Sequence, residues 1–330
     1  MMHVQRWFIE RDGRVMMHRV AHHLWLSALA ALALAAAACS LPPGDLPATV
    51  TPLPEAGPSA SLPAPGLPPT TPLPTTTTPV EPTSSPAPET LYRVVFVRDD
   101  DVLNVRSGPG ASNPIRGMLA YNETGVRITG AGQPVGGSTW VPVEHNGLTG
   151  WVNQTYLTEQ VDQATFCTDM RAEQLIADLR RAVSTGDGVG LARLVHPSRG
   201  LLIRHNWWNP EVVIPYDEVE RFFVDDRPRD WGIYDGSGLP ITGGTAEVIV
   251  PLLQRDLIEG AQVTCGMLLG GATAGLVILP PEYEALNFYS VYRPAPGGDD
   301  TFDWGTWAVG IEYHSGQPYL AYLIHYQWEI

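Results

Sequence analysis

The stretch L-N-V-R-S-G-P-G at residues 103–110 decides the fold of the first folded segment. Leu103 and Val105 alternate as inward-facing positions of a strand, while Gly108 and Gly110 permit the tight loop that follows. Short β-rich runs recur around this stretch, each bounded by turn residues, at 93–97, 102–105, 125–128, 140–143 and 150–152. This pattern predicts a small, closed all-β barrel over residues 91–160.

A hairpin is expected within this segment at Asn146-Gly147, since both residues tolerate a positive φ. Four motifs then follow one another along the chain: 103–110, W-V-P-V at 140–143, G-W-V at 150–152 and Y-L at 156–157. In order and spacing they resemble the bacterial SH3 (SH3b) domain. The resemblance implies an SH3-like barrel that binds cell-wall peptides or other extracytoplasmic ligands, usually as a targeting module.

Polar and aromatic residues of this segment are the candidates for ligand contact. Arg106 suits a ligand carboxylate, but it suits local backbone carbonyls equally well. For Trp140 and Trp151, packing competes with a role as a binding platform. The full candidate set is Arg106, Tyr121, Asn122, Trp140, Trp151 and Tyr156.

Residues 166–330 have a different pattern, in which helical signals precede strands. Apolar residues recur at helical spacing over 173–183, and shorter helices are expected at 187–195 and 216–223. Strands are expected at 275–279, 286–292, 306–313 and 319–327. The order predicts an α+β domain with helices against a curved antiparallel sheet.

Two resemblances concern this second domain. A-V-S-T-G-D at 182–187, followed by 191–195, is similar to the first helices of nuclear-transport-factor-2-like folds. His196-Pro197, the stretch 231–238 and the ending 324–330 resemble an uncharacterised C-terminal domain of bacterial lipoproteins. These resemblances imply architecture and location but no activity.

The first 38 residues have the pattern of an export signal. An apolar run at 24–38 is too short to span a membrane and ends in A-A-A-C at 36–39. This ending resembles the lipobox of bacterial lipoproteins, with Ala36 where leucine is commoner. The resemblance implies a signal peptide over 1–38 and an acylated (palmitate-bearing) Cys39. The acyl chains would anchor the protein to the outer face of the cell membrane. Ordinary secretion is the alternative, and Met16 and Met17 leave the true start codon open.

Residues 39–90 are rich in proline and threonine and have too little apolar bulk to form a core. We expect a disordered stalk that could reach about 150 Å when fully extended. Whether that length is required or incidental stays open.

The net charge argues against one class of partner, and the cysteine content predicts a disulfide. The net charge is −15 and the chain has no lysine, so nucleic acid is not an expected partner. Cys167 and Cys265 remain after Cys39, and in an oxidising compartment they are expected to pair. Closing that loop would stabilise the fold by roughly 4 kcal/mol, and two free buried thiols are the alternative.

A search for catalytic patterns yields little. The chain has no H-E-x-x-H motif, and His196, His205, His314 and His325 are scattered. Cys167 lacks the sequence setting of a cysteine peptidase. Paired carboxylates were sought among Glu218, Glu220, Asp225 and Asp226, where a charged helix end is the simpler interpretation. We therefore predict neither an enzyme, a metal site nor a cofactor.

The second domain is rich in tryptophan, at positions 207, 208, 231, 304, 307 and 328. These side chains either line a ligand pocket or fill the core, and the core is favoured. Together the patterns predict a membrane-anchored extracytoplasmic binding protein whose barrel recognises peptidoglycan or another surface ligand. The alternatives are a wall hydrolase with its active site in the C-terminal domain, and a scaffold that binds envelope proteins.

Overall fold

The computed structural model describes residues 89–258, 260–271, 277–297 and 302–329. By its internal contacts the chain divides into units Met1–Pro79 and Val80–Ile330, and every described residue lies in the second unit. The expected signal peptide, Cys39 and nearly the whole stalk therefore lie outside the described residues. What is described is mostly β, with few helices.

The first folded segment is all-β, as predicted. Its main sheet has the strand order β3-β2-β7-β6-β4, β5 pairs with β6, and β1 pairs with β8. Every pairing is antiparallel, and a bridge from Tyr92 to Val126 links β1 to the residue before β4. The pairing path is thus open, so closure into a barrel is only partial. The elements are β1 (Tyr92–Val94), β2 (Val102–Arg106), β3 (Ile115–Ala120), β4 (Arg127–Ile128), β5 (Gln133–Val135), β6 (Ser138–His145), β7 (Leu148–Asn153), the 3-10 turn η1 (Gln154–Tyr156) and β8 (Leu157–Glu159).

Alternation along these strands builds the core. Leu103 and Val105 of β2 are buried together with Val141, Val143 and Val152 of the β6–β7 hairpin. Asn146 and Gly147 connect these two strands with φ values of +49° and +81°, so the predicted tight hairpin is confirmed. We call this segment the barrel domain.

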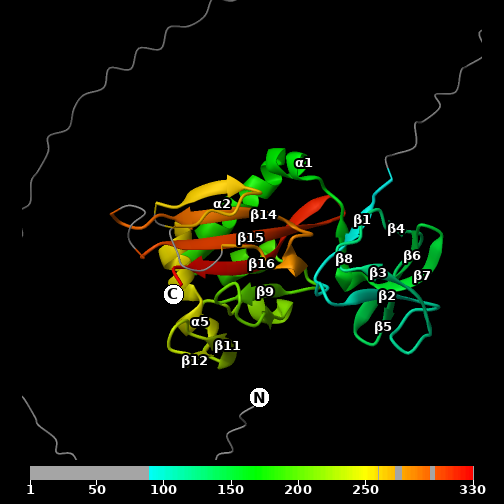
Figure 1. Cartoon of the computed structure of the whole chain (residues 1–330), viewed down its shortest axis with the longest axis horizontal. Helices are drawn as coiled ribbons and strands as arrows, with labels where there is room; N and C mark the ends of the chain where they lie inside the picture. Colours follow the sequence, from blue (N-terminus) through cyan, green and yellow to red (C-terminus); the bar gives the residue numbers. More distant parts are fainter. Residues whose placement is uncertain (1–88, 259, 272–276, 298–301, 330) are drawn as a thin grey trace, which may run out of the picture. The chain divides into compact units, whose positions relative to one another are not determined.

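The C-terminal domain is built on a six-stranded sheet with the order β10-β9-β16-β15-β14-β13, in which Figure 1 shows β9, β16, β15 and β14 side by side. The expected strands near 286–292, 306–313 and 319–327 are present as β14, β15 and β16. The antiparallel prediction is wrong for one pair, because β16 runs parallel to β9. The remaining pairs are antiparallel. The strands are β9 (Leu201–Arg204), β10 (Val212–Ile214), β13 (Gln262–Cys265), β14 (Asn287–Arg293), β15 (Gly305–His314) and β16 (Gln317–Gln327).

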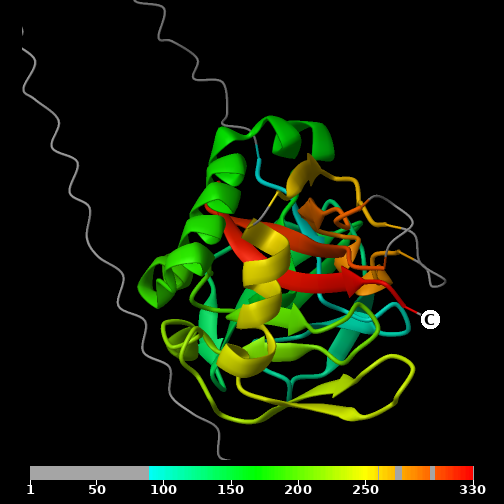
Figure 2. The same cartoon turned by 90° about the vertical axis from the view of Figure 1, so that its left-hand side faces the viewer.

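Helix α2 (Met170–Thr185) confirms the strongest helical prediction. Asp169 caps its N-terminus by accepting a hydrogen bond from the Arg171 amide, and Gly186 ends it with φ +66°. Its buried face packs against the sheet core, and Figure 2 shows it lying along one face of the sheet. The neighbouring helices are α1 (Gln163–Thr168) and α3 (Gly188–Leu194).

Two sequence predictions are corrected in this domain. The helix expected over 216–223 is only the single turn α4 (Tyr216–Val219), after which the chain turns toward Asp225. The strand expected over 275–279 is absent from its described part, residues 277–279. The remaining elements are the hairpin strands β11 (Arg229–Ile233) and β12 (Pro240–Gly243), helices α5 (Thr245–Val248) and α6 (Val250–Leu253), the π-helix η2 (Gln254–Ile258) and the 3-10 turn η3 (Pro281–Tyr283).

The expected disulfide is confirmed between Cys167 of α1 and Cys265 of β13, with a Cα–Cα distance of 5.7 Å. It ties the first helix to the edge strand of the sheet. Three of the tryptophans fill the core, as favoured from the sequence, because Trp231, Trp304 and Trp307 are fully buried.

The two domains share buried contacts. Val95, which directly follows β1, is fully buried within the core on the sheet face opposite α2. Thr158 of β8 donates its hydroxyl to the carbonyl of Tyr313 at 3.2 Å and accepts from the Tyr313 amide at 2.9 Å. The barrel domain is therefore packed onto the C-terminal sheet.

Candidate functional site

A pocket of about 390 Å³ opens in the barrel domain, and we call it the barrel pocket. It combines aromatic, amide and charged side chains, the mixture expected where a small number of polar groups orient a ligand. Its lining is Phe96, Val97, Arg98, Asp101, Val102, Leu103, Asn104, Arg106, Ala111, Trp140, Asn153 and Tyr156.

Three of the six candidate residues meet in this pocket: Arg106, Trp140 and Tyr156. Arg106 also donates from Nη1 to the Asn113 carbonyl at 2.8 Å, so it braces its own loop while lining the pocket. Trp140 is only 7 % exposed, so packing accounts for most of its surface. Both interpretations weighed for Arg106 and Trp140 therefore apply in part.

The other three candidates do not line the barrel pocket. Tyr121 packs against the barrel core, and Asn122 is exposed in the turn after β3. Trp151 lies half-buried on β7, opposite Pro142 in the register. The structure brings in their place Asn104, Asp101 and Asn153, the last of which caps η1 by accepting from the Thr155 amide at 3.0 Å.

Phe96 is a pocket residue that sequence reasoning missed. Its φ is +57°, a left-handed backbone that costs a bulky residue about 1–2 kcal/mol. Its ring lies under the Arg199 guanidinium, 4.4 Å from centroid to Cζ, and meets the Tyr283 ring edge-on at 6.1 Å. Nothing in the local sequence marks this position, because its neighbours belong to the C-terminal domain.

Arg199 holds the region around Phe96 in place. It donates from Nη1 to the Thr155 carbonyl of the barrel domain and from Nε to Glu312 of β15 at 2.8 Å. Burial alone would raise the pKa of Glu312, but the charge of Arg199 lowers it below its usual value. The buried Arg199–Glu312 ion pair lies within the C-terminal domain, and it positions Arg199 for its hydrogen bond to the barrel domain.

A second hollow of about 650 Å³ adjoins this contact, and we call it the interface pocket. It shares Phe96 and Arg98 with the barrel pocket. Its lining is Phe96, Arg98, Asp99, Arg204, Trp208, Asn209, Pro210, Glu211 and Glu282.

Charged groups of the C-terminal domain form one wall of the interface pocket. Arg204 pairs with Glu282 and donates from Nε to the Tyr283 hydroxyl at 3.1 Å. That hydroxyl in turn donates to Glu211. Burial, reinforced by the charge of Glu211, raises the pKa of Tyr283 far above its usual value, so the phenol stays a donor at neutral pH.

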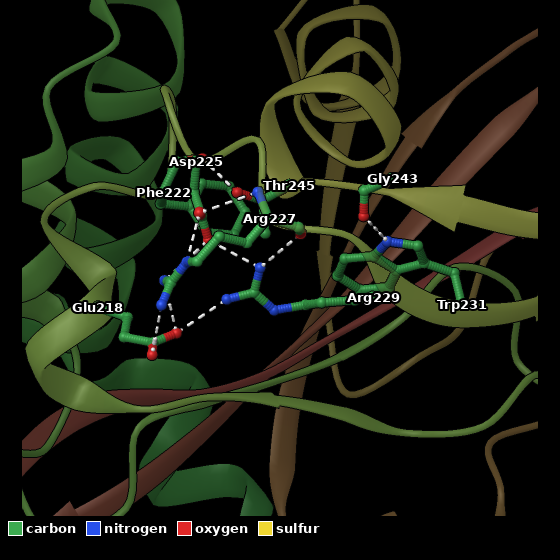
Figure 3. Close-up of polar contacts among 8 residues, drawn as sticks. All are labelled: Glu218, Phe222, Asp225, Arg227, Arg229, Trp231, Gly243 and Thr245. Carbon is green, nitrogen blue, oxygen red and sulfur yellow. Dashed lines mark hydrogen bonds and ion pairs between the residues drawn. The ribbon is translucent and has the colours of Figure 1, made fainter.

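Two of the four carboxylates considered for glycoside cleavage, Glu218 and Asp225, are held by arginines (Figure 3). Arg227 donates to Asp225 at 2.7 Å and to Glu218 at 2.8 Å, and Arg229 donates to the same two carboxylates at 2.7 and 2.8 Å. Hydrogen bonds from Arg227 are the main cause that lowers the pKa of both acids. The cluster joins α4 to the β11–β12 hairpin.

The scattered histidines form two pairs rather than one centre. His196 and His314 stack at a centroid distance of 3.8 Å, and His205 lies 6.5 Å from His325. Burial lowers the pKa of both His196 and His205 to about 4. Among the described residues, no group of three His, Cys, Asp or Glu side chains is arranged to hold a metal ion.

His325 belongs to a buried charge network centred on Asp256 of η2. Asp256 accepts from His325 Nε2 at 2.8 Å, from Arg293 Nε at 2.7 Å and from Arg255 at 2.7 and 2.8 Å. Desolvation would raise its pKa, but these donors lower it well below the usual range. Four hydrogen bonds to one carboxylate mark it as a structural centre.

Comparison with known proteins identifies one part of the chain. Residues 101–158 match the family model of the bacterial SH3 domain, which covers most of the barrel domain and of the barrel pocket lining. This domain suggests a cell-wall or peptidoglycan-binding role, and domains of this kind are typically extracytoplasmic. No curated protein and no solved structure matches the chain.

The described segments contain no helix that is both long and apolar enough to cross a membrane.

Proposed function

We propose that this chain is a lipid-anchored extracytoplasmic binding protein whose barrel pocket binds a cell-wall peptide. The observation that carries the proposal is the position of the pocket, because nine of its twelve lining residues lie in the segment that matches the bacterial SH3 domain. Aromatic faces at Trp140 and Tyr156 suit the apolar parts of a peptide, and Asn104 and Asn153 suit its amides.

Blocking the pocket tests this function without removing a core residue. Ala111 is exposed and lines the pocket, whereas its neighbour Ser112 is exposed and does not. We expect Ala111→Trp to lower binding of the full acylated protein, held in detergent, to purified sacculi by at least about tenfold. Ser112→Trp is the matched control and should bind like the unaltered protein.

Co-sedimentation with sacculi measures both variants. Equal binding by Ala111→Trp and Ser112→Trp would place the ligand elsewhere. If the unaltered protein stays in the supernatant when the sacculi sediment, and instead captures envelope proteins, the chain is a protein scaffold.

The anchor is the second part of the proposal and is supported by the A-A-A-C ending at Cys39. We expect a clickable palmitate analogue to label the protein in the producing bacterium, and the protein to remain with membranes after a salt wash. Cys39→Ser should abolish both. Labelling that persists in Cys39→Ser would show that another residue is acylated.

We further propose that the protein binds without catalysis. In support, Cys167 is bonded to Cys265, and Glu218 and Asp225 are both held by two arginines. Incubation with purified sacculi should release neither new reducing ends nor new free amines. Release that is lost in Glu211→Gln or Glu282→Gln would instead show a hydrolase in the interface pocket.

A further inference from the structure

We propose that the barrel pocket and the interface pocket are two subsites of one groove, and that the interface subsite binds an ammonium group of the same ligand. The ligand is then a peptide that carries a free primary amine. This inference rests on the proposed function and extends it, because it assigns a binding role to the C-terminal domain.

Continuity of the two pockets is the first step. Phe96 and Arg98 line both of them, so the two hollows adjoin at these two side chains. Phe96 keeps its left-handed backbone because Arg199 and Tyr283 enclose its ring. Strained residues that are held by their surroundings concentrate at ligand sites. The surroundings of Phe96 therefore fix the conformation of the wall that the two subsites share.

The two subsites differ in charge. Arg98 lines both pockets and is paired with Asp100, so the remaining charges of the barrel pocket are Arg106 and Asp101, one of each sign. The interface pocket has three acids, Asp99, Glu211 and Glu282, against Arg98 and Arg204. The interface pocket therefore favours a cationic group.

Pairing within the interface pocket sharpens this difference. Arg204 is neutralised by Glu282, and Arg98 forms an ion pair with Asp100 at 2.7 Å. Among the described residues, Asp99 and Glu211 form no ion pair. Glu211 accepts the hydroxyl of Tyr283, and burial raises the pKa of Glu211 although this hydrogen bond and the charge of Arg204 lower it. Two carboxylates in one hollow are thus left for a cation from the ligand.

Neutral groups of the interface pocket suit the same occupant. Trp208 presents its indole to the pocket and is fixed by a hydrogen bond from Nε1 to Glu329 at 2.7 Å. Asn209 donates from Nδ2 to the Ile233 carbonyl at 3.1 Å, which holds its side chain in place. An aliphatic amine would meet Trp208 with its methylenes and the carboxylates of Asp99 and Glu211 with its ammonium.

Chemical modification of sacculi separates this proposal from the proposed function. The full acylated protein is titrated against native sacculi and against sacculi whose free amines have been acetylated, with co-sedimentation as the readout. We expect acetylation to weaken binding of the unaltered protein by about tenfold. The double variant Asp99→Asn/Glu211→Gln should bind native sacculi about as weakly and should no longer distinguish the two preparations.

A matched control uses two exposed acids outside both pockets, Asp217→Asn/Glu284→Gln, which should discriminate like the unaltered protein. Equal binding of native and acetylated sacculi by the unaltered protein would overturn the ammonium subsite. So would a double variant Asp99→Asn/Glu211→Gln that still discriminates. Failure of the unaltered protein to bind either preparation would instead overturn the proposed function, so the two failures are distinct.

Discussion

Asp225 and Asp256 of the C-terminal domain and the groove acids Asp99 and Glu211 have different roles, although they look alike in the sequence. Asp225 and Asp256 are buried, and each is held by two arginines. Asp99 and Glu211 border an open hollow and form no ion pair among the described residues. Burial together with the number of partners therefore separates acids that stabilise the fold from acids that are available to a ligand.

The strongest link on the stabilising side is covalent. The disulfide closes a loop of 98 residues, so Cys167→Ser/Cys265→Ser should lower the free energy of unfolding by about 4 kcal/mol. Urea unfolding followed by tryptophan fluorescence measures the change. Because neither cysteine lines the groove, binding to sacculi should persist wherever the variant is still folded. A variant as stable as the unaltered protein would show that the bridge adds nothing.

Loss of the Asp256 charge should have the next largest effect. Asp256→Asn cannot accept from Arg293, Arg255 and His325 together, and it leaves the nearly buried Arg293 without full compensation. We expect a loss of about 3 kcal/mol in urea unfolding. Asp303→Asn is the control, since that partner of Arg293 is 65 % exposed and should cost less than about 1 kcal/mol. Similar losses in both variants would contradict this assignment.

Acid should weaken the fold through His205. Its pKa is about 4 in the folded chain against an ordinary value of 6.5, mainly because of burial. The unfolded chain therefore binds a proton that the folded chain does not, so stability is complete above pH 6.5 and falls as pH drops toward 4. In His205→Phe, the loss between these pH values should shrink by about 2 to 3 kcal/mol. Parallel stability–pH curves for the two proteins would rule this out.

The cluster in Figure 3 should respond more moderately. Asp225→Asn removes the charge that pairs with Arg227 and Arg229, but Arg227 is half-exposed and both arginines keep Glu218. A loss of about 2 kcal/mol is expected from urea unfolding. Glu218→Gln, at a more exposed position, should cost less. The reverse order would show that Glu218 is the centre of the cluster.

The smallest change in stability is expected for the acids of the groove. Asp99→Asn removes an exposed charge that has no ion-pair partner among the described residues, so unfolding should change by less than about 0.5 kcal/mol. A loss above about 1 kcal/mol would place Asp99 among the stabilising acids and remove the contrast between the two regions.

Much of the barrel domain is predictable from local pattern, and the reasons are visible in its strands. β2 alternates cleanly, and Asn146-Gly147 fixes the hairpin between β6 and β7. β3 was missed because its pattern is broken by Gly117, where any Cβ would lie 2.7 Å from the Leu148 side chain, and by the exposed Met118. In the C-terminal domain β9 was missed because its apolar residues are covered on both faces and show no alternation.

The candidate site was predictable only where one domain supplies it. Arg106, Trp140 and Tyr156 follow from barrel motifs, and they do meet in the barrel pocket. The interface pocket joins Asp99 to Glu211 and Glu282, which lie far apart in the chain. No local pattern links such positions, so only the packing of the two domains reveals them.

The position of β16 has a consequence for biosynthesis. Among the described residues β16 follows the other strands of its sheet in sequence, yet it occupies the middle of the sheet, parallel to β9 and antiparallel to β15. Until residues 317–327 have been synthesised, β9 and β15 each keep an unpaired edge, and the sheet cannot close. A premature stop before residue 317 would therefore leave two unpaired strand edges exposed to other chains and to proteases.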